Sequence, residues 1–488
     1  MSAKPSQVID RDVEWGDLRD FVSSRSRGLR IGIVYGRRRQ GKSFLLRRLC
    51  AAVGDTALYT MALEQERQPA LDRFADAVGV HRGLGSSTLR FAEWDRALTF
   101  ALDSRLVVID EFPYLLPHSP ELSSVVQSLY DQRREDPSAP RLILCGSAIS
   151  VMNELLSGTR ALRGRAVVDL CVKPFGYRAA ARLWKIDDPE VAFHVHAVLG
   201  GTPGYRDLIE AGPPRRREDL GRWLAGHALN PSHALFTETD YLLREDPRVT
   251  DRALYHSVLT AISAGASTPS RIAQAVGRPE RSLAHPLAVL ETAGFVRRTE
   301  DVLLQRRARF TVTDPIVRFQ LLITRPRLTD FEERRTLEAW RAAEATFSSQ
   351  ILGPHFEELA RDWTATHAPT EALGGPLGEI GPSVVNDPAG RSQHELDVVA
   401  LAPGEVPRHK HARVALLGEA KWADRPRTVT DLRRLEHIRG LLVARGTRAE
   451  RGRLVLFGRS GFEPELARQA ARRDDVLLVD LADLYRPR

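Results

Sequence analysis

One loop sequence limits the folds open to this chain more than any other feature. It reads Gly36-Arg37-Arg38-Arg39-Gln40-Gly41-Lys42-Ser43, with an apolar run before it and an apolar helical pattern, beginning at Phe44, after it. The spacing fits G-x-x-x-x-G-K-[ST], in which the glycines let backbone N–H groups turn inward around phosphate oxygens. We therefore predict a strand, a phosphate-binding loop and the start of a helix within residues 31–46.

The loop is expected to bind ATP together with Mg²⁺. Lys42 would reach the β- and γ-phosphates, and the Ser43 hydroxyl would ligate the Mg²⁺ that bridges them. A chance match in an arginine-rich turn is the competing interpretation, and the flanking strand and helix patterns argue against it. The predicted nucleotide contacts run along the loop into the helix: Gly36, Arg37, Arg38, Arg39, Gln40, Gly41, Lys42, Ser43 and Phe44.

Two further apolar runs are predicted to bring polar groups to the same nucleotide. Residues 106–109 are apolar and lead directly into Asp110 and Glu111, as in a buried parallel strand whose carboxyl end faces a ligand. We predict that Asp110 holds the Mg²⁺ through its water shell and that Glu111 orients or deprotonates the attacking water. Ser147 follows a second buried run and would either sense the γ-phosphate or cap a helix.

The composition is that of globular domains without a membrane segment. The chain has 488 residues, about three or four domains at roughly 150 residues each. It carries no recognisable leader and no long uncharged apolar segment, so we expect a cytoplasmic protein with no membrane partner. The net charge of +8 permits a polyanionic partner such as nucleic acid without requiring one.

Three isolated cysteines, without disulfide or metal spacing, are expected to be buried thiols: Cys50, Cys145 and Cys171.

The scarcity of lysine gives weight to the few that occur. Only six of the 71 cationic residues are lysine. A compact ammonium cannot be replaced by the planar guanidinium of arginine at a site shaped for it. Lys42 and Lys421 are therefore more informative than any single arginine.

Several motifs follow one another in the first 210 residues. They are YGRRRQGKSFLL at the loop, VVIDEFPYLL at 107–116, LCGSAISVM at 144–152, LRGR at 162–165 with Pro174-Phe175 beyond it, and LGGTPGY at 199–205. In this order they resemble the archaeal-type ATPase family, AAA+-related signal-transduction ATPases. The alternating strands and helices predict a parallel α/β sheet for the P-loop NTPase core, residues 1–175.

By the same resemblance, an arginine of the LRGR motif contacts the γ-phosphate. Arg165 is the first candidate, acting within its own chain or from a neighbouring subunit of a homo-oligomer. Family members often carry an aromatic residue where Arg163 stands, so the choice between the two arginines stays open. A surface arginine without a catalytic role is the alternative for each.

The middle of the chain is predicted to be helical. Residues 176–248 are interpreted as the lid of the ATPase, in which Gly200-Gly201 is either a hinge or a simple helix break. Residues 249–330 carry three helical patterns, the last at 281–293, and two short strand patterns, which together predict a winged helix-turn-helix. The last helix would offer Arg281, Ser282 and His285 to DNA, but Pro286 lies inside it, and we favour a protein-docking or regulatory role.

The C-terminal module, residues 331–488, contains a second pattern of charged residues on predicted strands. Asp397 lies in one strand, and Glu419 and Lys421 lie two residues apart, on one face, in the next. Two carboxylates and a lysine at this spacing could hold Mg²⁺ or Mn²⁺ against a phosphodiester. D…E-x-K resembles the signature of the PD-(D/E)xK, or restriction-endonuclease-like, fold, and Glu357 matches the acidic residue that many members add. Alternating charges on an exposed strand are the competing interpretation.

Together these patterns predict an ATP-hydrolysing switch that controls a nuclease-like domain. The alternatives are a DNA-binding or scaffold ATPase whose C-terminal domain is catalytically inactive, and a stress-signalling ATPase with a protein partner. The predicted catalytic residues are Glu111, Lys42, Arg165 or Arg163 in the ATPase and Asp397, Glu419 and Lys421 in the C-terminal module; the predicted metal ligands are Ser43, Asp110, Glu357, Asp397 and Glu419.

Overall fold

The N-terminal part of the chain is a parallel α/β core. The computed structural model describes residues 3–157, 162–305 and 308–486. Five parallel strands form the first sheet in the order β2-β3-β4-β1-β5. β3 and β4 are buried at every position, because helices cover both faces of the sheet. The strands are β1 (Arg30–Tyr35), β2 (Ala57–Met61), β3 (Leu106–Asp110), β4 (Arg141–Gly146) and β5 (Ala166–Cys171).

Alternate side chains of these strands build two separate apolar layers. Val34 and Val108 pack with Leu45 on one face, whereas Ile33 and Ile109 pack on the other. The first face is covered by α1 (Asp12–Ser23) and α2 (Lys42–Val53); the second is covered by α3 (Arg67–His81), α4 (Trp94–Ala101), α5 (Leu122–Gln132) and α6 (Ile149–Leu156).

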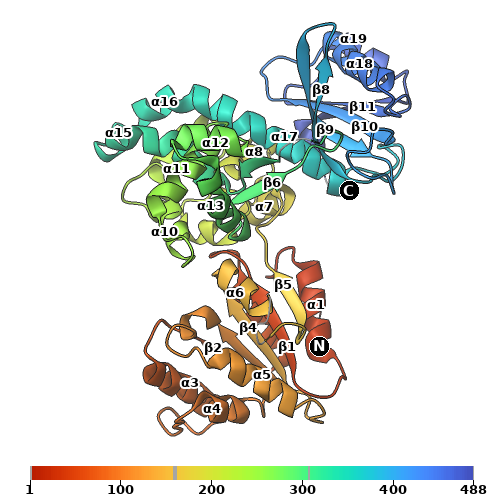
Figure 1. The fold of residues 1–488 in the computed structure, drawn as a ribbon. Coiled ribbons are helices and arrows are strands. Elements are labelled where there is room, and N and C mark those ends of the chain that lie inside the picture. Colours follow the sequence, from red (N-terminus) through yellow and green to blue (C-terminus); the bar gives the residue numbers. More distant parts are fainter. Residues whose placement is uncertain (1–2, 158–161, 306–307, 487–488) are drawn as a thin grey trace.

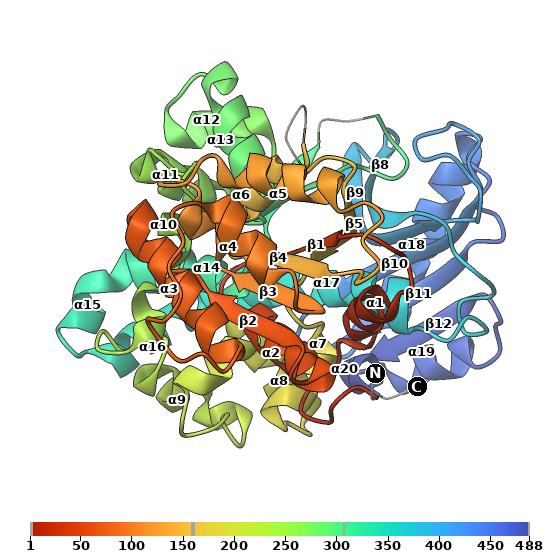
Figure 2. The ribbon, with the colours of Figure 1, turned by 90° about the horizontal axis from the view of Figure 1, so that it is seen from below.

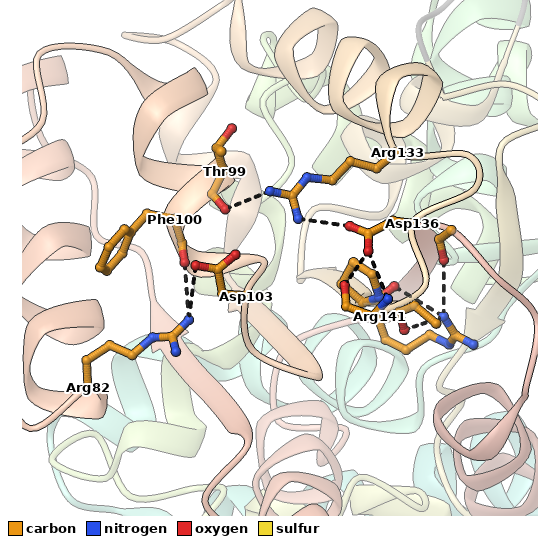
Figure 3. A network of polar contacts seen from close by, with 11 residues as sticks. Arg82, Thr99, Phe100, Asp103, Arg133, Asp136 and Arg141 are labelled. Atoms are coloured by element: carbon orange, nitrogen blue, oxygen red, sulfur yellow. Dashed lines mark hydrogen bonds and ion pairs between the residues drawn. The ribbon is translucent and has the colours of Figure 1, made fainter.

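Arginine side chains close the amino-terminal edge of this sheet. Arg141, only 1% exposed, donates to the backbone carbonyls of Phe21 and Ser24 at 3.0 and 2.8 Å. Arg133 joins the Thr99 carbonyl to the Asp136 carboxylate, as Figure 3 shows. The side-chain hydrogen bond from Ser138 lowers the pKa of Asp136. These contacts satisfy backbone groups where strands begin, and leave the opposite edge for the phosphate loop.

A helical region follows the core. Its helices are α7 (Tyr177–Trp184), α8 (Pro189–Leu199), α9 (Leu220–Gly226), α10 (Glu238–Arg244), α11 (Arg252–Ser263), α12 (Pro269–Val276), α13 (Glu280–Thr292), α14 (Pro315–Phe319), α15 (Leu328–Glu332) and α16 (Thr336–Thr346). β6 (Val296–Thr299) and β7 (Arg309–Val312) pair as an antiparallel hairpin after α13. Pro286 lies inside α13 without ending it. Three helices and a hairpin therefore form where the sequence predicts them, with shifts of one to three residues at their ends.

The C-terminal domain is a mixed sheet between helices. β8 (Ile380–Asp387), β9 (Ser392–Leu401) and β10 (Val414–Lys421) are antiparallel, and β11 (Arg453–Gly458) and β12 (Val476–Asp480) continue from β10 in parallel. One face of the sheet packs on α17 (Gly353–Asp362), which continues from α16 through a π-helical turn at Phe347–Leu352. α18 (Val429–Ala444) packs on the other face; α19 (Pro464–Ala470) and α20 (Leu481–Tyr485) complete the domain.

The three parts are arranged around the helical region. In Figure 1 the α/β core lies on one side of it and the C-terminal domain on another. Figures 1 and 2 both place α15 and the C-terminal domain at opposite ends of the molecule. α16 packs on α9, so residues 336–346 lie within the helical region. Among the described residues, no helix is both long enough and apolar enough to cross a bilayer.

Candidate functional site

The phosphate loop forms at the carboxyl end of β1, as predicted. Gly41 has φ +87° and precedes the first residue of α2, Lys42, whose ammonium donates to the Arg37 carbonyl at 3.1 Å. A Cβ on Gly36, which has φ +151°, would lie 2.2 Å from the Val172 carbonyl oxygen. Because side chains are excluded at these two turns, the loop can present backbone N–H groups to an anion, and its residues fit a triphosphate.

Asp110, the last residue of β3, and Glu111, which follows it, lie at the same edge of the sheet. Asp110 is fully buried and accepts from the Tyr59 hydroxyl at 2.5 Å and from the Glu111 N–H at 3.0 Å. Glu111 adopts a left-handed backbone conformation with φ 53°. Its carboxylate accepts from the Ser147 hydroxyl at 2.9 Å and from the Ser147 N–H at 3.1 Å. Ser147 thus holds the predicted water-orienting carboxylate, a contact the sequence did not predict.

The three arginines of the phosphate loop bind carboxylates of the helical region. Arg37 pairs with Asp314 at 2.8 Å, and its guanidinium stacks 4.2 Å from the centre of the Phe295 ring. The other two pairs are Arg38 with Glu245 at 2.7 Å and Arg39 with Glu238 at 3.1 Å. Burial raises the pKa of Glu245 despite its arginine partner. These ion pairs join two parts of the chain, and the predicted contacts of the loop with a nucleotide, which use its backbone N–H groups, stay a prediction.

A tight turn of the helical region rests directly on the phosphate loop. The Gly204 N–H donates to the Arg39 carbonyl at 3.0 Å, and a Cβ on Gly204 would lie 2.7 Å from the Arg39 Cβ. A Cβ on Gly201 would overlap the Phe175 carbonyl oxygen at 1.8 Å. Glycine is required here because two backbone segments touch, so the turn of residues 200–204 is a contact point as well as a break between helices.

Arg163 and Arg165 lie at the far end of the sheet. β5 runs parallel to β1, with Ala166 beside Ile31 and Cys171 beside Tyr35. Residues just before β5 therefore lie at the amino-terminal edge, whereas the phosphate loop follows Tyr35 at the carboxyl edge. Arg165 pairs with Asp131 of α5 at 3.1 Å. In this conformation neither arginine reaches the phosphate loop of its own chain.

Asp397 lies at a bulge in the C-terminal sheet. Gly381 pairs with Val399 and Ser383 with Leu396, so Asp397 and Val398 together oppose one residue of β8. The Asp397 carboxylate accepts from the Ala420 N–H at 2.8 Å, just beyond the last paired residues of β9 and β10. The bulge turns the carboxylate toward the strand that carries Glu419 and Lys421.

Burial, and with it repulsion between neighbouring carboxylates, raises the pKa values of two acidic residues at this site. Burial raises the pKa of Asp397 to about 6, with a further contribution from Glu419. Burial, and then the Asp397 charge, raise the pKa of Glu357 to about 8. A divalent cation would relieve this repulsion, and the donors present are the carboxylate oxygens that Mg²⁺ and Mn²⁺ prefer.

Glu419 is the least available of the three acidic residues. It is 7% exposed and accepts from Arg434 of α18 at 3.1 Å, while the buried Arg427 lies 3.5 Å away. Its Oε2 atom is buried and faces Arg427 in that ion pair, without a hydrogen bond among the described residues. The Lys421 ammonium makes no hydrogen bond or ion pair with the described part of the chain.

A cavity of about 350 Å³ opens beside Glu357 and Asp397, between the C-terminal sheet and the β6–β7 hairpin. Arg309 of the hairpin reaches Glu395 at 3.3 Å, and Asp301 accepts from the Ser383 hydroxyl at 2.7 Å. A larger cavity of about 640 Å³ lies between α1 and β5, away from both acidic sites. The hairpin therefore forms one wall of the space in front of the predicted nuclease residues.

Three groups of residues at or near these sites could not be predicted from the sequence. Tyr59 and the carboxylate partners of the loop arginines have no local signature, since they come from distant segments. The third is a group of three ligand atoms that all lie within 4.8 Å of one another. Among the described residues this group consists of Asp387, His394 and His437, and does not include the predicted metal ligands Glu357, Asp397 and Glu419.

Comparison with known proteins gives distant likenesses. No model of a known protein family matches the sequence. An uncharacterised protein of Methanocaldococcus jannaschii is 25% identical over 427 residues, which cover 85% of this chain and 88% of that protein. A solved Walker-type ATPase of Pyrococcus abyssi is 18% identical with a TM-score of 0.48, over 65% of this chain and 97% of that one. The ORC2 protein of Aeropyrum pernix is 13% identical with a TM-score of 0.42, over 70% and 97% of the two chains. At these sequence identities and TM-scores, no activity of these proteins is assigned to this chain.

Proposed function

We propose that the α/β core binds and hydrolyses ATP. The observation that carries this proposal is the meeting of three polar segments at one edge of a parallel sheet: Lys42 and Ser43 after β1, Asp110 and Glu111 after β3, and Ser147 after β4. The carboxyl edge of a parallel sheet is where such folds bind ligands.

Each of these side chains has a task that follows from its chemistry. The loop N–H groups and Lys42 bind the phosphates, and Ser43 and Asp110 hold the Mg²⁺. The bound ion neutralises charge that develops on the phosphate oxygens. Glu111 accepts a proton from water, or orients the water, once its carboxylate leaves Ser147. Ser147 therefore acts in two ways, holding Glu111 at rest and facing the γ-phosphate when the nucleotide is bound.

An arginine from a neighbouring copy completes this site in our proposal. Arg163 and Arg165 precede β5 at the edge of the sheet away from their own phosphate loop. Contact with a γ-phosphate from this position requires a second chain, so hydrolysis would depend on self-association. A positive charge beside the transferring phosphoryl group is the role of such an arginine.

We further propose that ATP binding controls the C-terminal domain as a metal-dependent nuclease. Glu357, Asp397 and Glu419 would hold Mg²⁺ or Mn²⁺, and Lys421 would activate water or steady the phosphate. Control is supported by the wall that the β6–β7 hairpin forms in front of Glu357 and Asp397. The hairpin belongs to the same helical region that the loop arginines bind, so a shift at the loop would move the α/β core against the body that carries both the hairpin and the acidic residues, and would change access to that space.

A second candidate function is favoured by the surroundings of Glu419. Two arginines already compensate its charge, Arg434 at 3.1 Å and Arg427 at 3.5 Å. If these pairs persist, the domain binds no metal there and the protein is an ATPase that recognises DNA or a protein. α13 supports DNA recognition to the extent that it exposes Arg281, Ser282 and His285.

One experiment separates the two candidates. Full-length protein is incubated with plasmid or single-stranded DNA, ATP and Mn²⁺, and compared with Lys421→Ala and with the matched surface variant Lys410→Ala. The nuclease proposal predicts cleavage by the wild type and by Lys410→Ala, loss of cleavage in Lys421→Ala, and equal ATP hydrolysis in all three. Absence of cleavage by the wild type, with ATP hydrolysis intact, would leave the ATPase with an inactive domain.

A further inference from the structure

Three side chains that neither proposed activity uses meet at one end of the C-terminal sheet. Asp387 is the last residue of β8, and His394 is the third residue of β9, across a short hairpin. His437 comes from the middle of α18, which packs against the same end of the sheet. Segments separated by fifty residues thus bring two imidazoles to one carboxylate.

The distances between these atoms match the edges of a metal coordination shell. The Nε2 atoms of His437 and His394 lie 2.9 and 3.6 Å from the same oxygen, Oδ2 of Asp387. Zn²⁺ binds nitrogen and oxygen ligands at about 2.0–2.1 Å, so neighbouring ligands of a tetrahedral ion are about 3.3 Å apart. The three ligand atoms therefore need only small movements to enclose an ion.

Two details indicate that the cluster is more than a pair of surface ion pairs. The His394 Nε2 atom is buried, and its contact with Asp387 Oδ2, at 3.6 Å, is longer than a normal hydrogen bond; no other hydrogen-bond partner lies among the described residues. A buried polar atom without a partner is costly unless a ligand satisfies it. In addition, the Gly390 N–H holds the other Asp387 oxygen at 2.9 Å, and a Cβ on Gly390 would lie 2.7 Å from Oδ2. The hairpin backbone thus fixes the orientation of the carboxylate.

We infer that Asp387, His394 and His437 form a binding site for a divalent transition metal of the Zn²⁺ class. Two imidazoles and one carboxylate are a donor set suited to Zn²⁺, whereas the all-carboxylate cluster at Asp397 suits Mg²⁺ or Mn²⁺. His394 lies three residues before Asp397, roughly 10 Å along the strand, so the two sites are separate.

The position of this site determines what the metal does. It cross-links the β8–β9 hairpin to α18, the helix whose Arg434 binds Glu419. His437 is 54% exposed, so a remaining coordination position faces solvent and takes water. Bound metal therefore fixes α18 against the sheet. The fixed point, His437, lies about one helical turn from Arg434, the arginine that governs access to Glu419.

The test measures metal content of the full-length chain directly. Metal-stripped protein is incubated with Zn²⁺, freed of excess by gel filtration and analysed by mass spectrometry for zinc. Parallel samples carry Co²⁺, whose visible absorption reports tetrahedral nitrogen and oxygen ligation. The variants are His394→Gln and His437→Gln. His411→Gln is the matched control, a histidine of the same domain that is exposed, and Glu419→Gln removes the other acidic site.

The inference predicts one zinc per wild-type chain, retained in His411→Gln and Glu419→Gln and lost in both His394→Gln and His437→Gln. Zinc should also raise the unfolding temperature of the wild type and leave that of His437→Gln unchanged. Because His437 is half exposed, its variant should fold, and its circular dichroism and ATP hydrolysis check this. The inference is overturned if the wild type binds no stoichiometric zinc, or if both histidine variants keep it. Neither result bears on the ATPase or nuclease proposals, which are measured without zinc.

Discussion

The helical region meets its two neighbours through very different surfaces. Toward the α/β core it presents carboxylates, and the three loop arginines bind them at 2.8, 2.7 and 3.1 Å. Toward the C-terminal domain it presents aromatic side chains: Phe193 of α8 stacks on Trp422 with ring centres 4.2 Å apart. The hydroxyl of Tyr177 also donates to the Leu484 carbonyl at 2.7 Å.

The two surfaces differ in what they can do. Buried residues of the helical region and of the C-terminal sheet belong to one continuous apolar core, which includes Phe193, Phe356 and Phe457. The α/β core has apolar layers of its own. The pair of the half-exposed Arg38 can break and re-form at little cost in free energy. The more buried pairs of Arg37 and Arg39 cost more to break, and a shared apolar core resists separation most. The helical region and the C-terminal domain should therefore move as one body, and nucleotide-driven change should occur at the phosphate loop.

Removing an aromatic side chain from the apolar surface should have the largest effect. Phe193 is fully buried, and Phe193→Ala should lower the free energy of unfolding by about 3–5 kcal/mol, because it deletes contacts with Trp422 and Phe356 and leaves a cavity. Urea denaturation measures this change. Val80→Ala, at a position 62% exposed, is the control and should stay within about 0.5 kcal/mol. If Phe193→Ala and Val80→Ala have the same free energy of unfolding, the aromatic surface around Phe193 is not packed as an apolar core.

Acid should weaken the same surface through His194, whose ring lies 5.7 Å from that of Trp422. Burial lowers the pKa of His194 to about 4, and its Nδ1 atom contacts the Glu190 carbonyl. The unfolded chain binds a proton below about pH 6.5, so stability is complete above that pH and falls by about 3 kcal/mol as the pH drops toward 4.

The acid effect is followed by denaturation between pH 7 and 4.5, with His194→Phe as the comparison. The variant keeps an aromatic ring and loses the titrating group, so its stability should depend less on pH. An identical pH dependence in both proteins would assign the acid sensitivity to other groups.

A substitution at the nucleotide site should change ATP hydrolysis and leave the apolar surface intact. Glu111→Gln should lower ATP turnover about 100-fold or more while ATP still binds, because the amide cannot accept a proton from water. Phosphate release and nucleotide binding are measured on the same preparation. Turnover equal to that of the wild type would exclude Glu111 as the base or as the residue that orients water.

The smallest effect is expected for a single ion pair of the polar surface. Arg38 is half exposed, so Arg38→Ala should change the free energy of unfolding by less than about 1 kcal/mol. Added salt should shrink even this difference. A loss of several kcal/mol, measured by urea denaturation at low salt, would place this pair in a rigid interface and contradict the contrast between the two surfaces.

Local sequence patterns predicted the strands that are buried along their whole length. β3 and β4 were recognisable because each contains a run of four or more apolar or small residues and is buried throughout, and the phosphate loop because its glycines have a fixed spacing. β5 escaped notice because it is an edge strand with exposed alternate residues, and β8 because Gly381 and Pro382 interrupt it.

What the sequence could not provide are the partners of its charged residues. The loop motif does not predict that the side chain of each loop arginine binds a carboxylate some two hundred or more residues away. The arginines beside Glu419 and the bulge at Asp397 likewise depend on how strands and α18 come together. Tertiary neighbours, which no spacing rule encodes, decide whether an acidic residue is free to bind a metal.

The measurement that tests the central contrast uses two label pairs. Leu84 of the core, Leu337 of the helical region and Val406 of the C-terminal domain are exposed and can each be replaced by cysteine. Burial raises the pKa of the native thiols, that of Cys50 to about 12, so the new cysteines react first. Electron–electron distances are then recorded in the Glu111→Gln background with and without ATP and Mg²⁺. We predict that the 84–337 distance changes while the 337–406 distance does not. A change in the 337–406 distance, or no change in either, would contradict the account.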